Sequence, residues 1–207
     1  MSIIEFKEKF VDWLIIPKVE IEKEFPNYSA NSLTRWQKKG YIQKVRNGFY
    51  RLLNNKIKGD GDLFFIANRL YFPSYVSLQS ALSLYGFIPE GVFSITSIST
   101  RINRKFETPI GDFIYKNLRE DLYFGFTLHK TGQFYYRLAT PEKAVLDFLY
   151  LYPQYKDAAD MEGLRWNIFE IDEKFDFKLA EQYLKIYDSA ALSRRYAIFV
   201  DFVKNEL

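Results

Sequence analysis

The chain has 207 residues, of which 48% are hydrophobic, so it is long enough for a small domain followed by a medium one with a sizeable core. It has no cysteine and one histidine, which excludes disulfides, thiolate metal sites and a histidine-rich metal centre. Its formal net charge of +3 is uneven, because residues 1–58 carry a net charge of +6 and residues 59–207 a net charge of −3.

The apolar residues are not arranged for a membrane. No run approaches the roughly 18 apolar residues that a spanning helix requires. Acidic and basic residues interrupt every apolar run near the N-terminus, unlike in a signal peptide. We therefore expect a cytoplasmic protein without membrane contacts.

The chain begins with a pattern typical of two helices. Ser2 and Glu5 have the spacing of a capping box, and apolar residues recur after them at helical intervals. Pro17 suits the first turn of a second, short helix, which the pair Phe25-Pro26 ends.

A third helix is predicted over residues 30–39, with Ser29 as its N-cap and Gly40 as the residue that ends it. At about 100° per residue, this helix has two different faces. Leu33 and Trp36 lie on the apolar one. The opposite face carries the kinds of groups that read base edges and hold phosphates, on Asn31, Thr34, Arg35 and Lys38.

A β-hairpin is predicted directly after this helix, over residues 41–52. Asn47-Gly48 is a strong signal for a two-residue type I′ turn, in which both central residues have a positive φ. Three helices followed by a basic hairpin are typical of a winged helix-turn-helix, whose third helix enters the major groove. The wing tip, with Arg46, is then expected near the DNA backbone or the minor groove.

The charge pattern favours DNA as the ligand of this domain. Residues 29–58 contain eight basic residues and no acidic one, which is the electrostatic footprint expected of phosphate contacts. The alternatives are a solvated basic surface without a partner and a winged-helix module that binds only protein. The residues expected to contact double-stranded DNA are Ser29, Asn31, Ser32, Thr34, Arg35, Lys38, Lys39, Lys44, Arg46, Asn47 and Arg51.

Residues 59–207 predict a second, larger domain of mixed α+β class, joined to the winged helix of residues 1–58 by the Gly-Asp-Gly-Asp hinge at 59–62. Asp62 is interpreted as a helix N-cap. Strand patterns over 92–100, 110–115, 123–129 and 134–138 predict an antiparallel sheet with helices on one side. Helical patterns cover 63–70, 78–85, 140–151, 157–168, 177–187 and 190–204.

No catalytic residue, metal site or cofactor site is predicted in the second domain. The P-loop, Gly-x-Ser-x-Gly, HExxH and dinucleotide-binding patterns are all absent. Glu142, Lys143 and Asp147 lie near a helix start, where caps and surface pairs explain them better than acid–base catalysis. A basic cluster on an expected loop either contacts nucleic acid or a partner, or is an ordinary solvated turn; it consists of Arg101, Arg104 and Lys105.

Several segments carry a resemblance to a known family. They read YVSLQSALSLYGFIPE at 75–90, ITSISTR at 95–101 and ATPEKAVLD at 139–147, and they follow the N-terminal pattern KGYI…RNGFY at 39–50. Together they resemble the AbiEi-type antitoxins of type IV toxin–antitoxin (abortive infection) systems, which are also described as transcriptional regulators of viral defence. The resemblance covers residues 1–150, and the end of the chain matches no motif of the family.

The resemblance implies two functions for one non-enzymatic protein. The N-terminal domain would bind inverted repeats in its own promoter and repress the operon. The larger domain would counter a nucleotidyltransferase-like toxin without forming a stable complex with it. One alternative is an enzyme of nucleic-acid metabolism that docks through its winged helix, with acidic residues gathered near Asp60 and Asp62 or near Arg101. The other is a protein-interaction module.

Overall fold

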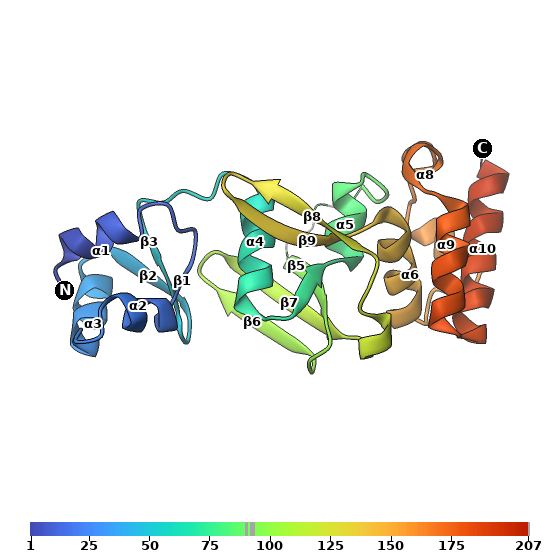
Figure 1. Ribbon diagram of the computed structural model, residues 1–207. Coiled ribbons are helices and arrows are strands. Elements are labelled where there is room, and N and C mark those ends of the chain that lie inside the picture. Colours follow the sequence, from blue (N-terminus) through green and yellow to red (C-terminus); the bar gives the residue numbers. More distant parts are fainter. Residues whose placement is uncertain (90, 92–93, 207) are drawn as a thin grey trace.

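The computed structural model describes residues 1–89, 91 and 94–206, and these form an elongated molecule (Figure 1). A small N-terminal unit lies at one end, a six-stranded sheet occupies the middle, and the last helices of the chain lie at the other end. The fold is of the mixed α+β class that the sequence predicts.

Within residues 1–52 the elements follow in the order helix, strand, helix, helix, strand, strand. α1 (Ile3–Lys9) begins with the expected capping box, in which the Ser2 hydroxyl accepts from the Glu5 N–H and the Glu5 carboxylate accepts from the Ser2 N–H. The later elements are β1 (Ile16–Pro17), α2 (Lys18–Glu24), α3 (Ala30–Lys38), β2 (Ile42–Arg46) and β3 (Phe49–Leu52). The strands form a sheet in the order β1-β3-β2, of which β1 is not predicted from the sequence.

An aromatic core holds this unit together. Phe6 of α1 is fully buried, and its ring centroid lies 5.1 Å from that of Trp36 on α3. Leu33 is buried beside them, so α3 packs through the apolar face that the sequence predicts. Gly40 follows the helix with a φ of +70°, a left-handed conformation that favours glycine, and the helix ends where expected.

The β2–β3 hairpin forms where expected, but its turn and register differ from the prediction. Gly48 has a φ of +82° whereas Asn47 does not have a positive φ, so the turn is not of type I′. A register shift between Lys44 and Arg46 interrupts the two-residue alternation of β2. As a result Val45 is buried in the core of the second unit, against which the hairpin packs.

The second unit combines one sheet with helices from three parts of the chain. Its strands are β4 (Ser74–Val76), β5 (Ser94–Ser99), β6 (Arg104–Thr108), β7 (Gly111–Asn117), β8 (Phe126–Thr131) and β9 (Phe134–Ala139). Its helices are α4 (Asp60–Leu70), α5 (Leu78–Leu84), the 3-10 turn η1 (Glu120–Leu122), α6 (Pro141–Leu151), α7 (Ala158–Gly163), α8 (Ile168–Lys174), α9 (Phe177–Tyr187) and α10 (Ala190–Glu206).

The central sheet is mixed, which corrects the expectation of an antiparallel one. Its strand order is β6-β7-β5-β4-β9-β8. β5 runs parallel to β7 and β4 runs parallel to β9, whereas the other neighbours are antiparallel. The mixture arises because the hairpins β6–β7 and β8–β9 each dock their second strand on the central β4–β5 pair, which leaves β6 and β8 at the edges.

Several local predictions also need correction. Arg104 and Lys105 lie on the edge strand β6 and not on a loop, and the exposed, charged pattern of this strand explains why it does not read as one. Asp62 lies inside the first turn of α4, whose N-cap is Gly59. The strand expected over 92–100 starts in residues outside the described part of the chain, and β5 covers its remainder.

α6 connects the sheet to the C-terminal helices. Thr140 caps it by accepting from the Lys143 N–H, and Pro141 is its first residue, as the sequence predicts. α6 packs against α5 on one side and against α9 and α10 on the other. α9 and α10 therefore lie at the end of the molecule that is opposite α3 (Figure 1).

The packing of α3 leads to a stability prediction. Replacing the buried Trp36 with alanine should lower the free energy of unfolding by about 3–5 kcal/mol, because it leaves a cavity against α1. Lys38→Ala on the exposed face of the same helix should change it by less than about 0.5 kcal/mol. Urea unfolding followed by circular dichroism measures both, and equal effects of the two substitutions would contradict this packing.

Candidate nucleic-acid interface

The outer face of α3 presents polar and basic side chains to solvent. All four side chains that the sequence places on this face are exposed, and Lys39 at the C-cap is exposed too: Asn31, Thr34, Arg35, Lys38 and Lys39. Within the described chain, neither Arg35 nor Lys38 forms an ion pair. Their charges are therefore available to a ligand.

The start of α3 adds backbone donors to this face. Ser29 stands at the N-cap position, as predicted, but its hydroxyl accepts no hydrogen bond from the first turn. No acidic residue lies in that turn, and Ser32 is half-buried there. The positive end of the helix dipole and its N–H groups therefore remain open to an anion.

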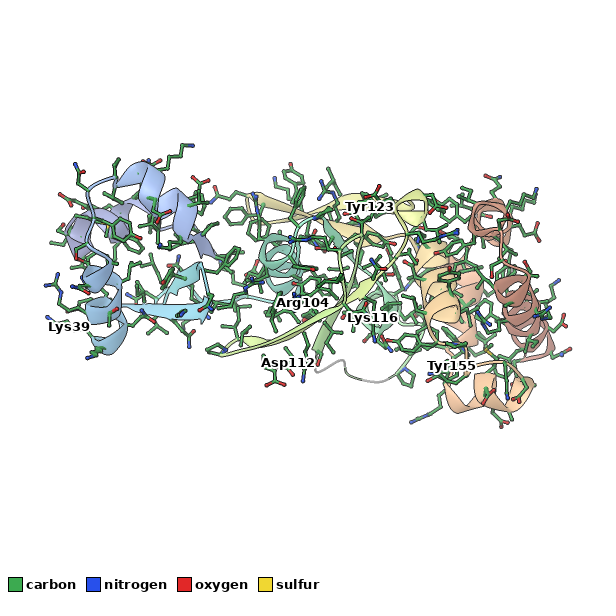
Figure 2. The ribbon with its side chains drawn as sticks, turned by 90° about the horizontal axis from the view of Figure 1, so that it is seen from below. Lys39, Arg104, Asp112, Lys116, Tyr123 and Tyr155 are labelled. Carbon is green, nitrogen blue, oxygen red and sulfur yellow. The ribbon has the colours of Figure 1, made fainter. Side chains whose placement is uncertain are left out.

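Two further candidate residues of the hairpin are exposed. Lys44 and Asn47 both face solvent, on β2 and in the β2–β3 turn. Lys39, which follows α3, lies at the outer end of the N-terminal unit and far from the sheet (Figure 2). The exposed basic groups of this unit thus spread from the end of α3 onto the hairpin.

Arg46 does not extend freely from a wing tip. Its Nη1 donates to the Leu70 carbonyl at the end of α4 over 2.9 Å, and its guanidinium lies 3.9 Å from the ring centroid of Phe106 on β6. Burial is the main reason why the pKa of Arg46 is lowered. The side chain therefore bridges the two units, and the hairpin turn is held next to the sheet.

Arg51 is a structural residue of the hairpin. Only 9% of it is exposed, its Nη2 donates to the Asn55 carbonyl, and its Nε has no hydrogen-bond partner in the described chain. Burial lowers the pKa of its guanidinium. Its side chain therefore supports the local structure of residues 51–55 and, unlike the candidate residues on α3, is largely withdrawn from solvent.

In the basic cluster of Arg101, Arg104 and Lys105, the charge of Lys105 is neutralised and the two arginine charges are available. Lys105 pairs with Glu107 over 2.7 Å and with Asp112 over 3.2 Å. Arg101 is exposed and lies 4.7 Å from the ring centroid of Tyr71, without an acidic partner in the described chain. Arg104 is exposed as well and forms no ion pair with any described residue. Both arginines lie close enough to Arg46 to lower its pKa.

Apart from the buried Arg51 and the ion-paired Lys105, the predicted residues therefore fall into two groups. One group covers α3 and the exposed residues of the hairpin. The other lies where the two units meet, and it joins Arg46 to Arg101 and Arg104, which are far apart from it in the sequence. Sequence reasoning found both sets of residues but did not place Arg46 with the second set.

The carboxylates of Asp60 and Asp62 at the hinge do not form a shared ligand site. Asp60 is exposed, whereas Asp62 is buried and accepts hydrogen bonds from the Lys58 N–H over 2.9 Å and from the Thr131 hydroxyl over 2.7 Å. Both carboxylate oxygens of Asp62 thus have partners that fix the linker to β8. The described residues contain no group of three or more His, Cys, Asp or Glu side chains that could hold a metal ion.

Glu142, Lys143 and Asp147 are buried, which corrects their interpretation as caps and surface pairs. Lys143 forms an ion pair with Asp147, one turn along α6, and neither side chain is exposed. Glu142 accepts from the Asp176 N–H and thereby holds the start of α9. The sequence did contain a signal of this burial, because these polar residues recur inside the apolar face of a helix.

Tyrosine and serine hydroxyls complete the surroundings of the Lys143–Asp147 pair. Lys143 Nζ donates to the hydroxyls of Tyr75 (2.9 Å) and Tyr187 (2.7 Å). The Asp147 carboxylate accepts from Tyr75 and Tyr187, and from Ser77 over 2.8 Å. The network ties α6 to β4 and to α9.

Removing one member of this network should be costly. Lys143→Met leaves the Asp147 carboxylate buried without a positive partner, and we expect a loss of about 3–5 kcal/mol in unfolding free energy. Lys185→Met makes the same chemical change on the exposed surface of α9 and should have little effect. Chemical denaturation compares the two variants; a loss below about 1 kcal/mol for Lys143→Met would show that the pair is not needed.

The buried tyrosines predict how stability depends on pH. Burial is the main cause that raises the pKa values of Tyr75, Tyr85, Tyr115, Tyr187 and Tyr196. Unfolded tyrosines lose their protons near pH 10, so above about pH 10 the folded state holds more protons than the unfolded state and its stability falls as pH rises. The lowered pKa of Lys143 acts in the opposite direction, but it is one group against five.

Tyrosinate absorbance combined with urea unfolding tests this dependence. In the folded protein the buried tyrosines should keep their protons at pH values at which the urea-unfolded chain, whose tyrosines ionise near pH 10, has lost them. Stability should be constant with respect to these groups at neutral pH and should decline at alkaline pH. Ionisation of all 16 tyrosines in one step by a folded protein would contradict the raised pKa values.

In the part of the chain that the structure describes, no helix has both the length and the apolar character needed to cross a membrane. No family model matches the chain, and no curated protein matches it.

Proposed function

We propose that this protein binds double-stranded DNA through α3 and the hairpin that follows it. The observation that carries the proposal is the outer face of α3, where amide, hydroxyl, guanidinium and ammonium groups are exposed together on a helix that contains no acidic residue. These groups hydrogen-bond to base edges and to phosphates, and an α-helix fits the major groove.

The arrangement of elements supports a winged helix-turn-helix over residues 1–58. Helices α1, α2 and α3 and a three-stranded sheet follow in the order that this architecture requires. In this proposal α3 is the recognition helix and β2–β3 is the wing. The wing packs against the second unit through Arg46, so its contribution to DNA binding comes from the exposed Lys44 and Asn47.

We further propose that the protein is a transcriptional repressor and the antitoxin of a type IV toxin–antitoxin operon. This part rests on the resemblance of residues 1–150 to AbiEi-type antitoxins, whose partner is a nucleotidyltransferase-like toxin. Residues 59–207 would then carry the antitoxin function, in a cytoplasmic protein without enzymatic activity of its own. The inverted repeats of its promoter would be the DNA target.

The enzymatic alternative receives less support. It requires acidic side chains gathered near Asp60 and Asp62 or near Arg101. Both carboxylate oxygens of Asp62 already accept hydrogen bonds within the fold, and no acidic residue of the described chain lines the pocket that contains Arg101. A role in protein binding alone would leave the acid-free surface of α3 without an electrostatic purpose. DNA binding accounts for that surface directly.

Fluorescence anisotropy with DNA from the region upstream of the gene tests the DNA-binding proposal. Affinity should fall with rising salt, because binding releases counterions from the phosphates. Arg35→Ala should weaken binding, and if Arg35 contacts a phosphate the salt slope should fall by about one. Lys185→Ala, at the opposite end of the molecule, is the matched control and should bind like the unmodified protein.

Two outcomes would reject the proposal. The first is the absence of binding at low salt, and the second is binding that does not respond to salt or to the loss of Arg35. To test the antitoxin role separately, the chain would be co-expressed with the product of the neighbouring gene. Failure to restore growth would reject that role while leaving DNA binding intact.

A further inference from the structure

A basic groove lies where the N-terminal unit meets the sheet. It has a volume of about 1040 Å³ and is lined by ten residues of both units, none of them acidic. Three of these residues are arginines from separate segments: Arg46 from β2, Arg101 from the turn after β5, and Arg104 from β6. The groove therefore lies at the junction of the two units, where Arg46 is the contribution of the N-terminal unit.

The floor of the groove is aromatic and holds two of the guanidinium groups in place. The ring centroids of Tyr71 and Phe106 lie 5.8 Å apart, and Tyr115 contacts both rings. The guanidinium of Arg46 lies 3.9 Å from the Phe106 centroid, and that of Arg101 lies 4.7 Å from the Tyr71 centroid. Stacking of this kind orders an arginine before any ligand arrives.

The positive charge of the groove is not neutralised from within. Alternation along β6 places Arg104 on the same face as Phe106. Lys105 also lines the groove, but its charge is balanced by ion pairs with Glu107 and Asp112, so the unpaired positive charge comes from the arginines. In the described chain Arg46, Arg101 and Arg104 form no ion pair, and Arg46 and Arg101 each donate only to a backbone carbonyl, of Leu70 and Phe72.

Each of these guanidinium groups has five N–H donors, so most remain unused. Three like charges near one another favour an anionic ligand, and the lowered pKa of Arg46, which is due first to burial and also to Arg101 and Arg104, shows that they influence one another. Planar, forked donors match the geometry of phosphate oxygens. The chemistry therefore indicates a phosphate-bearing ligand.

We propose that this groove binds the phosphate backbone of duplex DNA next to the segment that α3 contacts, with Arg101 and Arg104 as the phosphate contacts. α3 and β6 both lie in the lower half of the molecule in Figure 1, and Arg104 lies midway along the molecule (Figure 2), so a duplex that contacts α3 and runs toward the sheet would reach the groove. Arg46 supplies positive charge and keeps the two units in the orientation that aligns both contacts.

This inference rests on the proposed DNA binding, and duplex length separates the two. We would compare mixed-sequence duplexes of about 12 and about 30 base pairs, the shorter spanning about one helical turn and the longer extending beyond the α3 contact. Arg104→Gln should weaken binding to the longer duplex by roughly fivefold to tenfold at about 0.1 M salt and lower its salt slope by about 0.9, the effect of one lost phosphate contact. Binding to the shorter duplex should not change.

Two companion variants define the comparison. Arg104→Lys keeps the charge and should keep the salt slope of the longer duplex. Lys185→Gln removes an equally exposed charge from α9 and should bind both duplexes like the unmodified protein. Because Arg104 is exposed, its substitution should leave the unfolding transition where it was, which circular dichroism checks.

The groove is rejected if Arg104→Gln behaves like Lys185→Gln on the longer duplex, or if it weakens both duplexes equally. In either case a loss of affinity in Arg35→Ala would leave the proposed function standing. If neither duplex binds in a salt-dependent way, DNA binding itself fails, and the groove proposal fails with it.

Discussion

The ion pair between Lys143 and Asp147 is the interaction on which the second unit depends, because two full charges inside an apolar core persist only when each has a partner. Hydroxyls from β4, α9 and the residue after β4 surround it. α6 therefore cannot slide or rotate without leaving one of these groups unpaired. This network joins the sheet to the helices that follow it in the chain. The N-terminal unit packs against the second unit through a smaller contact.

That smaller contact is formed by side chains and not by the linker. Val45 is buried in the larger core, and Arg46 bonds to the end of α4 and stacks on Phe106. Both positions follow from the irregular register of β2, which turns two consecutive residues toward the second unit. The orientation of α3 relative to β6 is thus set by packing. In the proposed complex, this orientation decides which stretch of a duplex can touch both surfaces.

Much of the local structure could be predicted from the sequence. The capping box at Ser2, the limits of α3 and the Thr140 cap depend on neighbouring residues alone, and the structure confirms them. The mixed strand order could not be predicted, because it depends on which hairpin docks where. The same limit applies to charged residues: nothing near Arg46 or Lys143 in the sequence says that it meets Phe106 or Tyr187. Helical periodicity was enough to predict which side chains of α3 are exposed. The groove could not be predicted, because its residues come together only in the tertiary fold.

The elongated shape gives the uneven charge a direction. Residues 1–58 carry a net charge of +6 at one end, and the remaining residues carry −3 toward the other, so the molecule has an electric dipole along its length. A field of this form turns the protein as it diffuses toward a polyanion, so that the basic end arrives first. α9 and α10 then point away from the nucleic acid. If the protein acts as the proposed repressor, this orientation would keep its helical end open to other molecules while the DNA is bound.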